Sequence, residues 1–243
     1  MPLVSMIDHA VLHPTQTTDD LRADCQMCAE LGVASVCVKP SMVQLASELL
    51  AGSNTVPSTT IGFPHGGTTT AAKVRETQVA CEQGVREVDM VVNIGQVLAQ
   101  QWQQVEDDIR AVVEAAQAAN VITKVIFETG LLPNDDLKIR LCEISEQAGA
   151  AFVKTSTGFG FIKGAEGVLT STGATEHDIK LMCAHTSDKV QVKASGGIRS
   201  FADAQRFVAL GATRLGTSST KIIADGERDG QESSGQEISP SSY

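Results

Sequence analysis

Four charged residues interrupt apolar runs that have the composition of buried β-strands. Asp89 lies in EVDMVVN, Lys124 in KVIFETG, Lys154 in AFVKTSTGF and Lys193 in QVKASGG. A charged side chain inside a closed sheet must be paired or neutralised, because its unpaired burial costs several kcal/mol. A structural network of ion pairs and a catalytic site would both account for these residues.

The lysines indicate Schiff-base chemistry. Only the neutral amine attacks a carbonyl, and the ordinary pKa of lysine is about 10.4, so burial or a second cation must lower it. If the strands that carry Lys154 and Lys193 are neighbours, each lysine disfavours protonation of the other. A carboxylate such as Asp89, or Asp8 in the first strand, could then transfer protons. The spacing leaves open which of the two lysines is the nucleophile.

Two glycine-rich turns follow the last two predicted strands. Residues 195–197 come after one strand, and residues 216–219 come after the next and lead into a helical segment. Backbone N–H groups at such a helix start bind anions, and glycine lets the anion approach closely. Simple turn geometry would also explain the glycines, but in barrels the loops after strands seven and eight frequently hold phosphate. We therefore expect a phosphate site there, to which Gly158 contributes.

These residues require a scaffold that brings strand ends together. The chain supplies short runs rich in Val, Ile and Phe that alternate with segments of helical apolar spacing. The clearest helical stripe, at spacings of three and four, consists of Val105, Ile109, Val112, Val113, Ala116 and Ala119. The eight strand candidates are residues 6–12, 34–38, 58–62, 87–93, 121–127, 151–154, 190–194 and 213–216.

Strict alternation of strands and helices favours a parallel sheet, because parallel strands need crossover connections. Eight repeats predict a closed (β/α)₈ TIM barrel of the α/β class. An open, doubly wound sheet is the alternative, but the chain lacks a G-x-G-x-x-G turn after its first strand. A length of 243 residues suits one barrel domain. We predict this domain at residues 1–222 and a polar, flexible tail at residues 223–243.

Composition and charge exclude several classes of partner. The net charge of −10 disfavours nucleic acid, which calls for a broad basic surface. No apolar run reaches the roughly 18 residues of a membrane span, and the N-terminus lacks signal-peptide features, so we expect a cytoplasmic protein. The six cysteines are expected to be reduced thiols. Cys25 and Cys28 form a C-x-x-C, but in a helical segment we expect them to pack as small apolar residues.

Eight segments spread along the chain carry a family resemblance. They are IDHAVLHPTQT, VCVKPSMV, TTIGFPHG, EVDMVVNIG, KVIFETGLL, FVKTSTGF, VKASGGIR and GATRLGTSS. Over nearly its whole length the chain resembles deoxyribose-phosphate aldolase, a Schiff-base-forming (class I) aldolase. The resemblance implies reversible cleavage of 2-deoxy-D-ribose 5-phosphate to D-glyceraldehyde 3-phosphate and acetaldehyde, in deoxyribonucleoside catabolism. It also implies a reaction without metal or organic cofactor and a homodimeric or homotetrameric assembly.

The resemblance assigns roles that the spacing left open. The Schiff-base lysine of the family falls on Lys154, the lysine that lowers its pKa on Lys193, and the proton-transfer aspartate on Asp89. The remaining positions expected to bind substrate are Asp8, Cys37, Lys124, Thr157, Gly158, Gly196, Gly197, Gly216, Ser218 and Ser219.

The sequence departs from the family pattern at three places. Ala10 stands where a threonine is common, and His65, which we expect on a solvent-exposed loop, stands where a leucine often follows the Phe-Pro pair. The segment FIKGAEGVLTSTGATEHD after Phe159 is longer than usual and predicts a lid or a reshaped entrance, which affects the choice of acceptor aldehyde. Tyr243, the only tyrosine, could relay a proton if the tail folded over the site.

Two other functions compete with this interpretation. Another lysine aldolase, or a transaldolase acting on a larger sugar phosphate, would use the same chemistry, and substrate length would tell them apart. A non-catalytic barrel that binds a sugar phosphate is also consistent with the fold, because fold alone does not fix function. The presence of Lys154, Lys193 and Asp89 together favours an enzyme.

Overall fold

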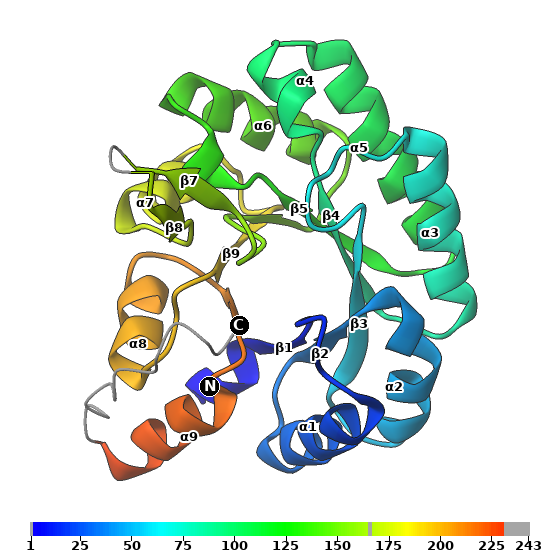
Figure 1. Cartoon of the computed structure of the whole chain (residues 1–243), viewed down its shortest axis with the longest axis vertical. Helices are drawn as coiled ribbons and strands as arrows, with labels where there is room; N and C mark the ends of the chain where they lie inside the picture. Colours follow the sequence, from blue (N-terminus) through cyan, green and yellow to red (C-terminus); the bar gives the residue numbers. More distant parts are fainter. Residues whose placement is uncertain (1, 165–166, 231–243) are drawn as a thin grey trace.

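The strands form a closed parallel barrel. The computed structural model describes residues 2–164 and 167–230. Within this part of the chain the barrel has the order β1-β10-β9-β6-β5-β4-β3-β2, and all neighbouring strands run parallel. In Figure 1 the strands occupy the middle of the molecule and the helices surround them. The barrel strands are β1 (Ile7–Val11), β2 (Ser35–Val38), β3 (Val56–Ile61), β4 (Glu87–Val91), β5 (Ile122–Ile126), β6 (Phe152–Lys154), β9 (Gln191–Ser195) and β10 (Arg214–Thr217).

The prediction of a (β/α)₈ TIM barrel in a single domain is confirmed. Each of the eight predicted strands is present, and the ends differ from the predicted ends by at most two residues. The first strand pairs with the last, β1 with β10, and this pairing closes the sheet. Closure brings strand ends that are far apart in the sequence to one mouth, where the loops after the strands meet.

Helices follow the barrel strands, and local sequence marks their ends. Thr17 and Asp20 form a capping box at the start of the first helix, and Gly32 ends that helix with a left-handed φ of 71°. The helices are α1 (Thr18–Leu31), α2 (Val43–Leu49), α3 (Thr70–Glu82), α4 (Ile94–Leu98), α5 (Trp102–Gln117), α6 (Asp135–Gln147), α7 (Glu176–Ala184), α8 (Phe201–Ala209) and α9 (Thr220–Asp229). Three 3₁₀ turns, counted within the described ranges, are η1 (Leu3–Met6), η2 (Pro40–Met42) and η3 (Thr129–Leu131).

Helix α5 shows how the apolar pattern builds the outer core. Five residues of the predicted stripe are buried, namely Val105, Ile109, Val112, Val113 and Ala116. Ala119 of the same predicted stripe lies beyond the end of the helix and is exposed. Among the helices of residues 2–164 and 167–230, none is long and apolar enough to span a bilayer.

The barrel interior is polar at the level of β4. All five residues of this strand are buried. Successive side chains of a strand point to opposite faces, so Glu87 and Asp89 share one face while Val88 and Met90 share the other. The contacts described below place the two carboxylates inside the barrel, and the apolar face packs against the surrounding helices.

The segment after Phe159 forms a β-hairpin. Its strands β7 (Phe161–Lys163) and β8 (Leu169–Ser171) pair antiparallel. The N–H of Thr172 donates to the carbonyl oxygen of Gly160 at 2.8 Å, and this bond closes the base of the hairpin. The hairpin leaves the barrel directly after the strand that carries Lys154.

The predicted domain boundary at residue 222 is wrong. Helix α9 continues well past it, and both Ile223 and Ala224 are buried. Glu227 of the same helix accepts a hydrogen bond from the N–H of Leu3 at 2.6 Å, which ties α9 to the start of the chain. The segment looks polar in the sequence because only one face of the helix is buried. The rest of the predicted tail, residues 231–243 with Tyr243, lies outside the described residues.

Candidate active site

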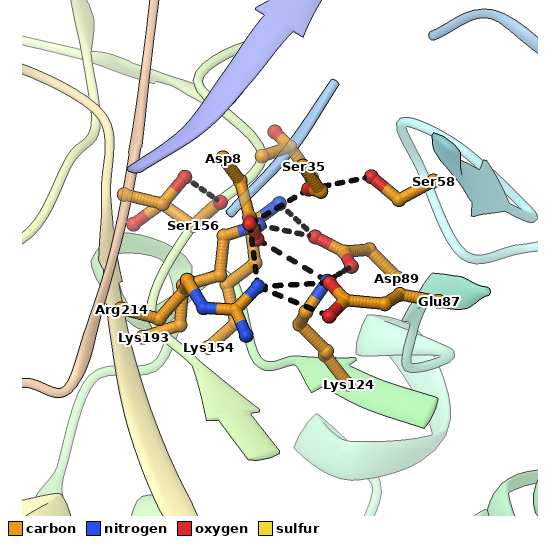
Figure 2. Close-up of polar contacts among 12 residues, drawn as sticks. Asp8, Ser35, Ser58, Glu87, Asp89, Lys124, Lys154, Ser156, Lys193 and Arg214 are labelled. Atoms are coloured by element: carbon orange, nitrogen blue, oxygen red, sulfur yellow. Dashed lines mark hydrogen bonds and ion pairs between the residues drawn. The ribbon is translucent and has the colours of Figure 1, made fainter. Parts of the chain in front are cut away.

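Neighbouring strands bring the predicted charged residues together. In the register of the barrel, Asp89 on β4 lies opposite Lys124 on β5, and Lys154 on β6 lies opposite Lys193 on β9. Each of these four side chains is at most 4% exposed. Asp8 on β1 joins them across the barrel. Figure 2 shows these side chains converging from different strands on one buried cluster.

Asp89 is the centre of this cluster. Its Oδ2 atom accepts from Lys154 Nζ at 2.8 Å and from Lys193 Nζ at 2.7 Å. Its Oδ1 atom accepts from Lys124 Nζ at 2.6 Å. Lys193 Nζ also donates to Oδ2 of Asp8 at 2.5 Å. One carboxylate therefore contacts all three predicted lysines, and the two candidate nucleophiles share a single oxygen atom.

Two members of the cluster were not predicted. Glu87 accepts from Lys124 Nζ at 2.6 Å, and Arg214 Nη1 lies 2.6 Å from Asp8 and 2.9 Å from Glu87. Both residues sit two positions before a predicted site residue on the same strand, Glu87 before Asp89 and Arg214 before Gly216. The two-residue period of a strand, which puts such pairs on one face, could have identified them.

The charges of the cluster balance if one lysine is neutral. Its contacts join the carboxylates of Asp8, Glu87 and Asp89 to Lys124, Lys154, Lys193 and Arg214. Four cations would face three carboxylates in a buried space, where an uncompensated charge is costly. Release of one proton from a lysine removes the excess charge.

The surroundings single out Lys154 as the lysine that most readily loses its proton. Burial lowers the pKa of Lys154, and the positive charge of Lys193 lowers it further. The carboxylate of Asp89 raises it, but the pKa stays below the ordinary value. Burial also acts against the charged form of Lys193, but Asp8 and Asp89 outweigh it and raise the pKa of Lys193. The pKa of Lys124 is likewise raised, by Asp8, Asp89 and Glu87 against burial. Of the three lysines, Lys154 contacts the fewest carboxylates, since its only carboxylate partner in the cluster is Asp89.

A pocket of about 710 Å³ opens above the cluster. Lys154 and Lys193 form part of its wall, whereas Asp89 and Lys124 do not line it and are fully buried. The other predicted residues that line the pocket are Asp8, Cys37, Thr157, Gly158, Gly196, Gly197, Gly216, Ser218 and Ser219. The structure therefore places a lysine with a lowered pKa where a molecule in the pocket can reach it.

The predicted anion loops line this pocket. Gly196 and Gly197 have left-handed φ values of 88° and 80°, a conformation that favours glycine. Ser219 is the N-cap of α9, and its own side chain does not cap the helix. The free N–H groups at this helix start and the positive end of the helix dipole favour an anion. Arg199 and Lys221, which were not predicted, add two cationic residues to the wall.

The other residues singled out in the sequence are not members of the ion cluster. Cys37 is 2% exposed, and burial together with Asp89 raises the pKa of its thiol, which stays neutral. His65 is exposed and does not line the pocket, as expected for a loop residue, whereas Ala10 lines the pocket. Cys25 and Cys28 are buried in α1. Within the described ranges there is no group of three or more His, Cys, Asp or Glu side chains that could hold a metal ion.

Known aldolases match this chain over most of its length. The family model described as DeoC/LacD family aldolase matches residues 3–220. A relative named deoxyribose-phosphate aldolase from Carboxydothermus hydrogenoformans is 47% identical over 232 residues, which cover 95% of this chain and 97% of the relative. One of the same name from Clostridium perfringens is 44% identical over 225 residues, covering 93% of this chain and 95% of the relative.

A solved structure extends the comparison to three dimensions. The tetrameric deoxyribose phosphate aldolase from Aeropyrum pernix has a TM-score of 0.83 and 29% sequence identity, and the match covers 94% of this chain and 92% of that chain. The resemblance that the sequence motifs indicated is confirmed, and the chain belongs to the DeoC/LacD family of aldolases.

Proposed function

We propose that this chain reversibly cleaves 2-deoxy-D-ribose 5-phosphate to D-glyceraldehyde 3-phosphate and acetaldehyde through a Schiff base on Lys154. The relatives named deoxyribose-phosphate aldolase support the substrate. The observation that carries the mechanism is the position of Lys154. It is a buried lysine on the wall of the pocket, and its pKa is lowered while those of its two lysine neighbours in the cluster are raised.

Imine formation is the first step. The neutral amine of Lys154 attacks the aldehyde carbon of the open-chain sugar, and loss of water leaves a protonated imine. The positive nitrogen of this imine withdraws electrons from the adjacent carbon atoms. Lys193, with its raised pKa, keeps its own proton and is therefore not a competing nucleophile.

Carbon–carbon cleavage follows from the imine. When the 3-hydroxyl group loses its proton, the electron pair of the bond between carbons 2 and 3 moves toward the imine nitrogen. The products are D-glyceraldehyde 3-phosphate and an enamine on Lys154, which accepts a proton at carbon 2 and is hydrolysed to acetaldehyde. We assign the proton transfers to Asp89 with Lys193 and a water molecule, since Asp89 contacts both lysines but does not reach the pocket.

The phosphate group is the fixed end of the substrate. We assign it to the glycine loops around Gly196, Gly197 and Gly216 and to Ser218 and Ser219 at the start of α9. The binding energy of these phosphate contacts would hold the sugar chain against Lys154, so that the reacting atoms keep the orientation that the reaction requires. The chemistry itself needs no metal or organic cofactor, because the imine nitrogen serves as the electron sink.

We also propose a homo-oligomer and a cytoplasmic location. The tetrameric relative from Aeropyrum pernix supports an oligomer. A phosphorylated sugar is charged and does not cross membranes unaided, which supports a reaction in the cytoplasm, in the breakdown of deoxyribonucleosides.

Trapping of the imine tests the proposal. The enzyme is incubated with acetaldehyde, reduced with borohydride, digested and analysed by mass spectrometry. An ethyl adduct on Lys154 is the expected result. Absence of an adduct on Lys154 would overturn the mechanism. Faster cleavage of fructose bisphosphate or of a ketose phosphate would overturn the substrate while leaving the lysine chemistry intact.

A further inference from the structure

Glu128 is a buried carboxylate beside the pocket that the proposed reaction does not use. It follows β5 by two residues and is 1% exposed. Its backbone has a left-handed φ of 55°. A residue other than glycine holds this conformation at a cost in free energy, and the conformation persists only where the surroundings fix it.

The carboxylate of Glu128 joins two loop segments. Its Oε2 atom accepts from the N–H of Thr157 at 3.1 Å and from the hydroxyl group of the same residue. Its Oε1 atom accepts from the hydroxyl group of Thr172 at 3.1 Å. Thr157 precedes the β7–β8 hairpin and Thr172 follows it, so one carboxylate holds both ends of the hairpin.

The packing around this clamp is tight. A Cβ atom built on Gly160 would lie 2.7 Å from Cδ of Glu128, and one built on Gly130 would lie 2.5 Å from Cβ of Thr172. Real Cβ atoms do not approach other heavy atoms this closely, so both glycines are required for the segments to meet. The clamp is therefore a defined contact of the fold with little room for adjustment.

Both ends of the clamp continue into the wall of the pocket. Thr157 lines the pocket directly. On the other side, Gly173 follows Thr172, and a Cβ atom on Gly173 would lie 2.7 Å from the carbonyl oxygen of Gly196. The N–H of Ala174 donates to that same carbonyl oxygen at 3.1 Å. A shift of Thr172 would thus be passed to the glycine loop.

We infer that Glu128 is a positioning residue that fixes the Thr157 loop and the Gly196 loop relative to Lys154. This inference rests on the proposed function, since the two loops are where the phosphorylated part of the sugar would bind. Within the described part of the chain, the hydrogen bonds of the Glu128 side chain go to Thr157 and Thr172 and to no member of the ion cluster that sets the protonation of Lys154. Loss of the clamp should weaken binding of the phosphorylated substrate and leave imine formation with acetaldehyde intact.

Three variants and one control test this role. Glu128→Ala removes the clamp, whereas Glu128→Gln keeps one acceptor oxygen for Thr157 and offers an amide N–H to the hydroxyl group of Thr172. Thr172→Val keeps the shape of the side chain and removes one bond. Glu146→Ala is the matched control, because Glu146 also accepts from a backbone N–H and a hydroxyl group, those of Ser187, away from the pocket.

The measurements separate substrate binding from imine formation. In Glu128→Ala the KM for 2-deoxy-D-ribose 5-phosphate should rise at least about tenfold, because a buried donor loses its acceptor. Trapping of acetaldehyde on Lys154 should stay within about twofold of the parent rate. In Glu128→Gln the KM should return close to the parent value. Thr172→Val should raise the KM about threefold over the parent, and Glu146→Ala should leave it unchanged. Hydrogen–deuterium exchange of the peptide spanning residues 157–174 should accelerate in Glu128→Ala and Thr172→Val.

Specific outcomes would overturn the inference. An unchanged KM in Thr172→Val would do so, even if Glu128→Ala failed to fold. The inference would also fail if Glu128→Ala lost kcat and acetaldehyde trapping in parallel while its KM stayed the same. Unchanged hydrogen–deuterium exchange in the peptide of residues 157–174 would likewise overturn it. If the parent enzyme did not cleave 2-deoxy-D-ribose 5-phosphate at all, the proposed function would fail. The exchange measurement would then still decide whether Glu128 holds the two loops.

Discussion

Replacement of Lys193 by methionine should raise the pKa of Lys154, because the positive charge of Lys193 opposes protonation of Lys154. The Nζ atoms of the two lysines lie 2.8 and 2.7 Å from the same oxygen of Asp89, so they are at most about 5.5 Å apart. At this separation and an effective dielectric constant of about 20, two positive charges repel each other by about 3 kcal/mol. Methionine has a similar length and no charge, and its introduction removes this repulsion.

The change has a definite sign in a pH profile. Without Lys193, protonated Lys154 is opposed by one charge fewer and still contacts Asp89, so its pKa rises and less of the neutral amine is present at pH 7. At a pH below the pKa of Lys154, removal of a repulsion of about 3 kcal/mol lowers the fraction of neutral amine on the order of a hundredfold. The assay is the rate of acetaldehyde trapping by cyanoborohydride as a function of pH. The rising limb of the profile should move toward alkaline pH, and the rate should recover there.

Two further variants serve as controls for this prediction. Lys193→Arg retains the positive charge, so the rising limb should stay near its original pH even if the rate falls. Lys138→Met removes another ion-paired lysine, whose Nζ lies 2.7 Å from Asp178 between α6 and α7, and it should leave the profile unchanged. If Lys193→Met lowered the rate by the same factor at every pH, Lys193 would act in some way other than on the pKa of Lys154.

Three predictions concern the scaffold. The Nζ atom of Lys73 is fully buried and lies 2.5 Å from Asp108. Asp108→Ala removes this ion-pair partner and should lower the free energy of unfolding, measured by urea denaturation, by about 3–5 kcal/mol. A loss below about 1 kcal/mol would contradict the pairing argument. Ile223→Ala, in the buried face of α9, should cost about 2–5 kcal/mol in the same assay, whereas a residue of a free tail would cost almost nothing. Replacement of Cys25 and Cys28 by alanine should leave kcat and KM unchanged, and a loss of activity in this variant that a chelator reproduces in the parent enzyme would show that the C-x-x-C binds metal.

The barrel could be predicted from the sequence because its signals are local. Each strand is a short apolar run bounded by turn residues, and a helix such as α5 carries its apolar stripe at a fixed spacing. The predicted boundary at residue 222 failed for the opposite reason. Helix α9 buries only one face, and this face is stabilised by packing against residues at the start of the chain. The local sequence of α9 does not indicate that packing.

Several parts of the site depend on contacts between distant residues. Glu87 and Arg214 are separated by 127 residues and meet only because the sheet closes. Glu128 was not predicted, because its partners Thr157 and Thr172 come close to it only through the loop packing after β5 and β6. For such residues the sequence offers a type and a position on a strand or loop but no partner.

By itself, the sequence determined the strand-end lysines, the carboxylate among them and the glycine loops, because residue type and alternation fix which side chains can enter a barrel. It left Lys154 and Lys193 equivalent as nucleophiles unless the family resemblance was used. The tertiary structure distinguishes them on physical grounds. Lys193 lies between Asp8 and Asp89, whereas Lys154 contacts Asp89 alone, so burial and repulsion prevail only at Lys154. A pKa depends on the charges a few ångströms away, and those come from strands that only the closed barrel brings together.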